Sequence, residues 1–242
     1  MRLQVPPVRH PPLSFLVPYH HHLRRIRVVV PKHVEERPPV LVLFDGQNVL
    51  GDRGSHAGGW HAHNAVDRLP GTIRRPVIVA VDHGGEGRTH ELFRDLDAFL
   101  HFVMHRVLPS AERHLEKRFD PELRVVGGAS MGGLASLVSL ARHSEFFRGA
   151  IAMSPSAWLV PTELRHELHV TKLTPGTRIY LDVGERESER MVREARHVAH
   201  WLERRLPETH RMWRPDKRGR HRESDWRRRL PKALRFMFRR PD

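Results

Sequence analysis

The sequence predicts an α/β protein whose central sheet is mostly parallel and carries helices on both faces. Short apolar runs bounded by proline, glycine or charged turns alternate with segments in which apolar residues recur at helical spacing. Several of the runs are too apolar for strands with one solvated face, which is typical of parallel strands buried on both faces. This alternation of strands and helices indicates a doubly wound sheet.

The predicted elements follow from these patterns in chain order. Buried strands are expected at residues 25–30, 39–44, 76–81, 123–127, 147–153 and 178–183, with an edge strand at 209–213. Helices are expected at 91–115 with a break near Pro109, and at 131–142, 189–206 and 225–238. Residues 1–20 are expected to form an arm or edge segment, and no pattern fixes the segments 50–63 and 156–173.

The chain is strongly basic, with a formal net charge of +14 at pH 7 and a pI near 11.3. A charge of this size can attract nucleic acid or another anionic surface. Only five of the 42 basic residues are lysines, however, and the densest stretch, residues 204–240, also carries carboxylates and helical apolar spacing. No zinc-finger, RNP or helix-turn-helix signature occurs. We therefore interpret this stretch as a solvated helix face and expect no specific nucleic-acid partner.

Composition excludes several further classes of protein. The absence of cysteine removes disulfides, thiolate metal sites and a cysteine nucleophile. No apolar run approaches the roughly 18 residues of a membrane span, and prolines and charges interrupt the first residues, where a signal peptide needs an apolar stretch. We expect a cytoplasmic protein with a single domain over residues 1–242 and no membrane span.

The most informative motif is Gly128-Ala129-Ser130-Met131-Gly132, between a predicted strand and a predicted helix. A serine in Gly-x-Ser-x-Gly at such a junction occupies a strained turn that pushes its hydroxyl out of the sheet. Glycines on both sides leave room for the turn, because a side chain there would collide with the adjoining strand or helix. The alternative is a glycine-rich turn with an incidental serine, but the flanking elements favour a nucleophile.

A serine nucleophile requires a general base, an anion that orients the base, and backbone donors for an oxyanion. His221 is the candidate base among 20 histidines, because it lies late in the chain in a polar loop before the last predicted helix. His210 begins the edge strand, and the other late histidines fall in or beside helical patterns. The alternative for His221 is a solvent-exposed loop histidine.

The orienting acid should follow the strand predicted at 178–183. Glu187, three residues past the turn glycine Gly184, is the preferred candidate. Asp182 is the second candidate, although its place within the strand also suits a packing or pairing role. Glu185 and Glu189 are explained equally well as first-turn carboxylates favoured by the helix dipole.

Two backbone amides are candidates for an oxyanion hole. One is the amide of Met131, directly after the serine, and the other comes from the loop after the strand at 39–44. In that loop Gly46 permits close backbone approach, and Gln47 then directs its N–H toward the serine. The alternative is an ordinary Asp-Gly turn.

Motifs in a fixed order carry a resemblance to a known family over most of the chain. They are Leu43-Phe44-Asp45-Gly46-Gln47, Asp82-His83-Gly84-Gly85 with Arg88 and Glu91, Gly128-Ala129-Ser130-Met131-Gly132-Gly133, Met153-Ser154-Pro155-Ser156-Ala157-Trp158, Gly184-Glu185-Arg186-Glu187, and Gly219-Arg220-His221 with Trp226. In this order they resemble the putative-esterase family of α/β-hydrolases, which includes enterochelin, feruloyl and acetyl-xylan esterases, S-formylglutathione hydrolase and the mycolyl transferases. The enterochelin-esterase-like branch is the most similar. One departure is Arg218-Gly219, where the family usually has two glycines.

The resemblance implies a serine ester hydrolase of the α/β-hydrolase fold that acts on a small-molecule ester. Ser130, His221 and Glu187 would form its triad, and the amides of Met131 and Gln47 its oxyanion hole. The family needs neither a metal nor an organic cofactor, so none is expected here.

Two residues are expected to contact the substrate, Arg88 and Trp158. By charge and motif position, Arg88 would lie near the mouth of the site with Arg186 and Arg220 and would favour an anionic acyl or leaving group. The equal alternative is that these arginines pair with surface carboxylates, Glu91 or Glu187.

Three histidines near Trp60 are the nearest approach to a metal cluster. His56, His61 and His63 have only Asp67 as a nearby carboxylate. We therefore expect no metal site there.

Two other functions remain open at this stage. The same nucleophile could transfer the acyl group to a sugar or lipid hydroxyl, or the chain could be a basic binding protein with a vestigial site. The natural ester, its acyl-chain length and the oligomeric state, a homodimer included, are fixed by no pattern in the sequence.

Overall fold

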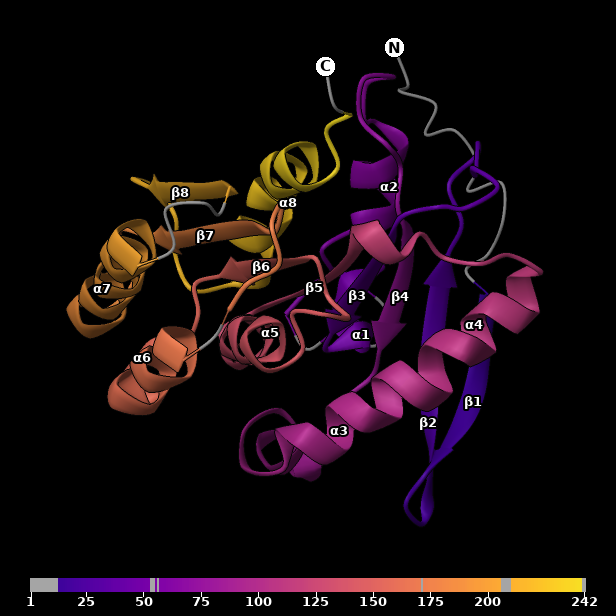
Figure 1. Cartoon of the computed structure of the whole chain (residues 1–242), viewed down its shortest axis with the longest axis horizontal. Coiled ribbons are helices and arrows are strands. Elements are labelled where there is room, and N and C mark those ends of the chain that lie inside the picture. The colour runs from indigo at the N-terminus through magenta and orange to yellow at the C-terminus, as the bar shows by residue number, and fades with distance from the viewer. Residues whose placement is uncertain (1–12, 53–54, 56, 171, 206–209, 241–242) are drawn as a thin grey trace.

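The computed structural model describes residues 13–52, 55, 57–170, 172–205 and 210–240. Within these residues one sheet of eight strands has the order β1-β2-β4-β3-β5-β6-β7-β8 (Figure 1). The strands are β1 (Leu13–Tyr19), β2 (His22–Val29), β3 (Val40–Phe44), β4 (Val77–Val81), β5 (Arg124–Ala129), β6 (Gly149–Met153), β7 (Arg178–Gly184) and β8 (His210–Asp216). The pairs β1–β2 and β2–β4 are antiparallel and all others are parallel. The predicted mostly parallel sheet is confirmed.

Helices cover both faces of the sheet, as predicted. One layer contains α3 (Leu96–Phe102), α4 (Leu108–Leu115), α5 (Met131–Arg142), α6 (Pro161–Val170) and α7 (Glu189–Arg205). The other contains α1 (Gly46–Val49), α2 (Ala62–Asp67) and α8 (Glu223–Met237), and Figure 1 shows α2 and α8 on the opposite side of the sheet from α3 and α5. Among the helices of the described residues, none is both long enough and apolar enough to cross a membrane.

The strands β3, β4 and β6 are apolar and buried at every position because each face of the sheet has its own core. In β3, Val40, Val42 and Phe44 face the layer of α3 and α5, whereas Leu41 and Leu43 face the layer of α2 and α8. All five residues are fully buried. Alternation with a period of two therefore supplies apolar side chains to two cores from a single strand.

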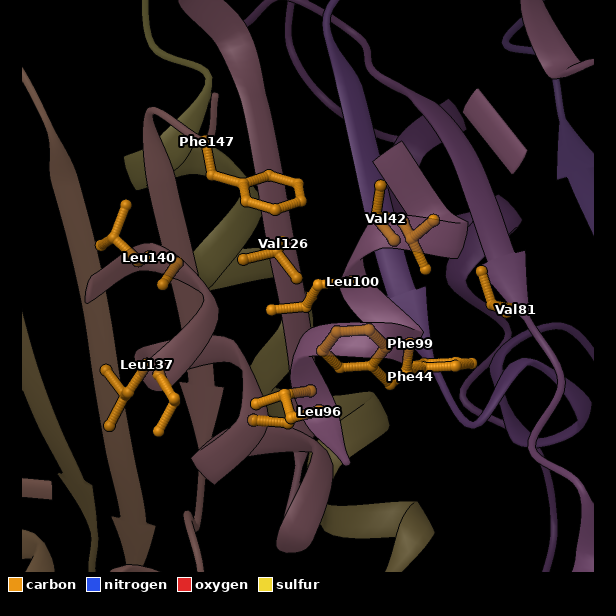
Figure 2. Packing of buried hydrophobic residues seen from close by; sticks show 14 of the residues in the cluster. Val42, Phe44, Val81, Leu96, Phe99, Leu100, Val126, Leu137, Leu140 and Phe147 are labelled. Atoms are coloured by element: carbon orange, nitrogen blue, oxygen red, sulfur yellow. The ribbon is translucent and has the colours of Figure 1, made fainter. Parts of the chain in front are cut away.

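Phe99 of α3 connects the first core to the antiparallel edge of the sheet. Figure 2 shows its ring beside Phe44 and Leu96 among the buried side chains. Its ring centroid lies 5.9 Å from that of Phe44 and 5.8 Å from that of Tyr19 on β1. One aromatic side chain thus joins α3, the strand β3 and the β1–β2 hairpin.

The helix predicted at 91–115 forms in segments, but the position of its break differs from the prediction. A π-helical segment at His90–Arg94 ends at Asp95, whose φ of −128° is not helical, and α3 begins there. A second π-helical segment, Val103–Val107, leads into α4, and Pro109 occupies the first turn of α4. Because the first turn of a helix needs no donor from its N–H groups, the proline is accommodated without a break.

The strand β1 and the helix α6 lie in segments for which we predicted only an arm or edge, or no defined element. The strand β1 forms the edge of the sheet beside β2, and residues 1–12 lie outside the described part of the chain. The helix α6 occupies most of the segment 156–173. Neither β1 nor α6 has a strong apolar period, which explains why the patterns did not fix them.

We expect Phe99→Ala to lower the free energy of unfolding by about 3–5 kcal/mol, because it leaves a cavity where two elements meet α3. His101→Ala, at an exposed position of the same helix, should change it by less than about 0.5 kcal/mol. Urea unfolding followed by circular dichroism measures both variants. Equal effects at the two positions would contradict this account of the core.

Candidate active site

Ser130 lies at the sharp turn between β5 and α5. Its φ of 56° and ψ of −121° place it in a strained region for a residue with a side chain. A Cβ on Gly128 would lie 2.6 Å from the backbone carbon of Gly132, so the two ends of the turn meet without space for a methyl group. The predicted elbow geometry is therefore present.

His221 joins this serine to an acid. Its Nε2 atom lies 2.9 Å from Ser130 Oγ, and its Nδ1 atom lies 3.0 Å from Glu187 Oε2. The Glu187 side chain is fully buried, whereas that of His221 is 32% exposed. The structure thus brings Ser130, His221 and Glu187 into one hydrogen-bonded chain. Ser130 and His221 are partly exposed, and Glu187 is the buried end.

The loops that carry the base and the acid are in direct backbone contact. A Cβ on Gly184 would lie 2.4 Å from the carbonyl carbon of Gly219. The Arg186 N–H donates to the Gly219 carbonyl at 3.0 Å, and the Glu185 N–H donates to the Asp216 carbonyl at 2.9 Å. The close approach to Gly184 requires a glycine at position 219 but not at position 218. The arginine at position 218, where the family usually has a second glycine, is therefore compatible with this contact.

Ser154, which directly follows β6, bonds to the Glu187 oxygen that does not face His221. Its Oγ accepts hydrogen bonds from Trp226 Nε1 at 3.1 Å and from Arg229 Nη2 at 2.9 Å. Because a hydroxyl has two lone pairs and one hydrogen, these donors direct the Ser154 hydrogen to Glu187 Oε1, 2.6 Å away. The Gly184 N–H donates to the same oxygen at 2.9 Å, so the other carboxylate oxygen is left for the imidazole.

Asp182, the second candidate for the acid, is engaged elsewhere. Its side chain is fully buried. One oxygen accepts from Arg229 Nη1 at 2.9 Å and from the Ser154 N–H at 3.2 Å, and the other accepts from the Tyr180 hydroxyl at 3.1 Å. Asp182 thus serves the pairing role that the sequence left open, and Glu187 is the carboxylate bonded to the imidazole.

The two buried carboxylates differ in how readily they ionise. Burial raises the pKa of Asp182 to about 6, although the Arg229 charge opposes the shift. Burial acts on Glu187 in the same direction, but hydrogen bonds from His221, Ser154 and the Gly184 amide outweigh it and hold the pKa of Glu187 below its usual value. Glu187 is therefore an anion at neutral pH.

The candidate oxyanion donors both lie in first turns of helices. Met131 is the first residue of α5 and Gln47 the second of α1, and the first N–H groups of a helix have no partner within it. A Cβ on Gly46 would lie 2.8 Å from the Asp82 nitrogen, so this loop needs glycine for its close approach. The Gln47 side chain accepts a hydrogen bond from the His83 N–H at 3.2 Å.

Arg88 lies beside Met131, the residue after Ser130, and is already paired. Its Nε and Nη2 atoms donate to the two oxygens of Asp45 at 2.6 and 2.7 Å, and its Nη1 lies 3.9 Å from Met131 Sδ. An ion pair between Arg88 and Glu91 was the alternative to substrate contact that the sequence left open. Glu91 bonds to the buried Arg24 instead. Asp45, which is buried, thus determines where the Arg88 guanidinium lies.

Glu223, at the start of α8, is a further carboxylate near the base. It accepts hydrogen bonds from Trp60 Nε1 and from Asn48 Nδ2, and burial raises its pKa. The Trp60 ring lies 6.1 Å from the Trp226 ring, which meets the His221 ring edge-on at 4.9 Å. Glu223 therefore ties α1 to α8, and Trp226 packs against the imidazole.

The other expected substrate residues have the following positions. Trp158 lies next to α7, where the Arg190 guanidinium sits 5.0 Å above its ring and donates to its carbonyl. Arg186 and Arg220 are exposed on the loops that carry the acid and the base. A contact of these side chains with substrate stays a prediction.

The histidine group near Trp60 is only partly within the described residues, since His56 lies outside them. His61 bonds to Asp52 at 2.9 Å, and its ring lies 6.0 Å from that of His63. In the part of the chain that the structure describes, no group of three or more histidine, aspartate or glutamate side chains has a geometry that could hold a metal ion.

Three residues around the hydrogen-bonded chain of Ser130, His221 and Glu187 were not predicted from the sequence. Ser154 and Ser156 stood within a quoted motif, but no pattern shows that Ser154 faces the acid or that Ser156 Oγ lies 3.2 Å from Ser130 Oγ. Arg229 was one arginine among many on the last helix. A buried position at helical spacing from Trp226, on an apolar face, was the signal that could have singled it out.

Comparison with known sequences finds a matching family model and a relative. A family model described as "Putative esterase" matches residues 20–237. The uncharacterized protein YbbA of Bacillus subtilis (strain 168) is 26% identical over 101 residues, which cover 41% of this chain and 40% of that protein.

Solved structures share the fold over nearly the whole chain. The BES protein of Bacillus cereus superposes with a TM-score of 0.80 at 20% identity and 98% coverage of both chains. The enterochelin esterase of Shigella flexneri has a TM-score of 0.78 at 23% identity; 95% of this chain matches 58% of that chain. A ferulic acid esterase has a TM-score of 0.73 at 19% identity and coverages of 95% and 99%. These structures have the α/β-hydrolase fold.

We expect Gly128→Ala to lower the free energy of unfolding by about 2 kcal/mol or more, because its methyl group would overlap the backbone of Gly132. Gly71→Ala is the matched control, since a Cβ there meets nothing within 4 Å. The control should leave stability unchanged or raise it by up to about 1 kcal/mol. Thermal unfolding of both variants measures the difference; a tolerated Gly128→Ala would show that the turn has more room than its geometry indicates.

Proposed function

The chain belongs to the putative esterase family, whose model spans residues 20–237, and from this premise we propose that it hydrolyses carboxylic esters through an acyl-enzyme formed on Ser130. The observation that carries the proposal is the hydrogen-bonded chain from Ser130 through His221 to the buried Glu187. It contains a nucleophile, a base and an orienting anion in the relation that acyl transfer requires.

Acylation begins at the Ser130 hydroxyl. Its Oγ attacks the ester carbonyl carbon while its proton passes to His221 Nε2, 2.9 Å away. The carbon–oxygen bond to the alcohol then breaks, and the same proton passes from Nε2 to the leaving oxygen. The acyl group remains on Ser130 and the alcohol departs.

The negative charge on the former carbonyl oxygen is held by the N–H groups of Met131 and Gln47. The Met131 amide directly follows Ser130, and the Gln47 amide follows β3, which pairs with β5; both are first-turn donors at the carboxyl edge of the sheet. Donors fixed by helices need no reorganisation as the charge develops, which is why such groups stabilise the transition state.

Deacylation repeats the sequence with water. His221 removes a proton from the water, and the resulting hydroxide adds to the acyl carbon. The proton then passes from His221 to Ser130 Oγ as the bond between the acyl carbon and Oγ breaks, and the carboxylic acid product departs. Glu187 accepts from His221 Nδ1 throughout, so Nε2 is the nitrogen that faces the serine and the imidazolium is stabilised. His221 carries the transferred proton in both acylation and deacylation, and the scheme uses no metal or cofactor.

The substrate is a small-molecule ester, in keeping with the enterochelin and ferulic acid esterases that share the fold. Arg88 lies within reach of an ester bound at Ser130, because it sits beside Met131. Since Asp45 occupies two of its nitrogens, Arg88 would contribute to the shape of the site more than to the binding of a strongly anionic group. Trp158 is proposed as a second contact.

We expect Ser130→Ala to lower the hydrolysis of p-nitrophenyl acetate, butyrate and octanoate by about a thousandfold or more. Ser139→Ala, a buried serine of α5 that bonds only along its own helix, is the matched control and should retain activity. A fluorophosphonate probe should label the wild type and not the Ser130 variant. Retained turnover or labelling after Ser130→Ala would refute the proposal.

Glu187→Gln should lower kcat by about a thousandfold or more with little change in KM, because a neutral amide neither stabilises the imidazolium nor enforces its tautomer. Glu185→Gln, an exposed neighbour paired with Arg196, should leave kcat within about twofold. Steady-state kinetics on the preferred ester measure both variants. A Glu187→Gln enzyme with near-normal kcat would exclude Glu187 as the orienting acid.

A further inference from the structure

Arg229 is a buried cation placed between two buried carboxylates. It is 3% exposed, lies on α8, and faces the ends of β6 and β7. Its Nη1 atom donates to Asp182 at 2.9 Å, and its Nη2 atom donates to Ser154 Oγ at 2.9 Å. The same Nη2 lies 3.6 Å from Glu187 Oε1. One guanidinium is thus hydrogen-bonded to one carboxylate and lies within ion-pair distance of the other, without a hydrogen bond to it.

The two carboxylates have different hydrogen-bond partners. Glu187 must accept from His221 Nδ1 if it is to orient the base, whereas Asp182 has no contact with the imidazole. An arginine that moved fully to Glu187 would neutralise its charge and compete with His221 for its oxygens. Because a buried arginine requires a carboxylate partner, Asp182 is what gives Arg229 a partner other than Glu187.

On the basis of the proposed triad, we infer that Asp182 and Arg229 are positioning residues: Asp182 holds the guanidinium away from Glu187, and the guanidinium holds the Ser154 hydroxyl against Glu187, so that Glu187 stays available to His221. Neither residue touches the reacting atoms. They act through Ser154 and Glu187, whose hydrogen bond of 2.6 Å sets the orientation of the acid.

Further charged groups act on this network, among them Asp216 at the end of β8, whose pKa is lowered in part by the charge of Arg229. Tyr180, on the same strand as Asp182, donates its hydroxyl to that carboxylate and has a raised pKa, chiefly from burial. Arg214 on β8 acts on Tyr180 through its charge. Glu223 lies on the exposed side of the imidazole, where the charge of His221 lowers the pKa of Glu223 and so opposes the effect of burial.

Farther from the base, Asp45 and Arg88 form their own ion pair and act on Glu223. That side of the site is therefore unchanged by a substitution at Asp182. We therefore expect a change of charge at Asp182 to act on the base through Arg229 and Glu187.

The test is Asp182→Asn, an isosteric change that keeps an acceptor for Arg229 but removes the negative charge. Arg229 should then pair with Glu187. His221 then shares Glu187 with the guanidinium, and the loss of part of this partner disfavours the imidazolium. The midpoint of the His221 ring titration should therefore fall by about one pH unit, kcat should fall about tenfold, and KM should stay within about twofold.

The His221 titration is followed by NMR and is assigned by comparison with His221→Gln, since the chain has 20 histidines. Asp120→Asn is the matched control, because Asp120 also pairs with an arginine, Arg74, at 2.7 Å but lies before the start of β5, at the opposite edge of the sheet. The control should leave the midpoint and kcat unchanged.

A double-mutant cycle shows whether Asp182 acts through Arg229. In the Arg229→Met background no guanidinium is present to move to Glu187, so Asp182→Asn should no longer lower the His221 midpoint, and the double variant should titrate within about 0.3 pH unit of the wild type. The inference is overturned if Asp182→Asn leaves the midpoint unchanged, or if it lowers the midpoint equally in both backgrounds.

This experiment separates the inference from the proposed function. The titration of His221 requires no turnover, so it reports on the network even if the ester hydrolysed by the enzyme is another one. Activity that survives Ser130→Ala would refute the proposed mechanism, whereas a Ser130-dependent enzyme whose His221 midpoint ignores Asp182→Asn would refute the positioning role.

Discussion

The contact between Gly128 and Gly132, which closes the turn around Ser130, is the constraint on which the site depends. It fixes the serine at the carboxyl end of β5, in the middle of the sheet. Since β3, β6 and β7 run parallel to β5, their carboxyl ends reach the same edge. These ends deliver the Gln47 amide, the Ser154 hydroxyl and the Glu187 carboxylate. Parallel pairing therefore assembles residues that are far apart in the chain.

The sequence predicted the central fold and the three residues of the hydrogen-bonded chain, because both depend on local signals. The buried strands were visible as apolar runs, and Ser130 and Glu187 each stand a fixed number of residues from a turn glycine. The roles of Ser154 and Arg229 could not be predicted, because they depend on side-chain directions across three elements. Similarly, Asp182 and Glu187 were separable only once the structure showed which carboxylate accepts from Tyr180 and which from His221.

The arginine content has a partly internal explanation. Arg24 and Arg229 are buried and bonded to carboxylates, and Arg74 joins two acidic side chains that precede different strands. The planar, forked guanidinium suits such sites, since it can donate to two acceptors at once and never loses its charge. A net charge that suggests an anionic partner is thus, in part, a set of ion pairs that hold the fold and the site together.

The backbone contact between Gly184 and Gly219 couples the two loops that carry the acid and the base. With Arg186 bonded to the Gly219 carbonyl, these loops form one rigid unit. Trp60 and Trp158, on the segments that precede α2 and α6, stand outside that unit. A substitution at Trp158, the second proposed contact, can therefore change which esters fit without moving the carboxylate of Glu187 relative to the imidazole of His221.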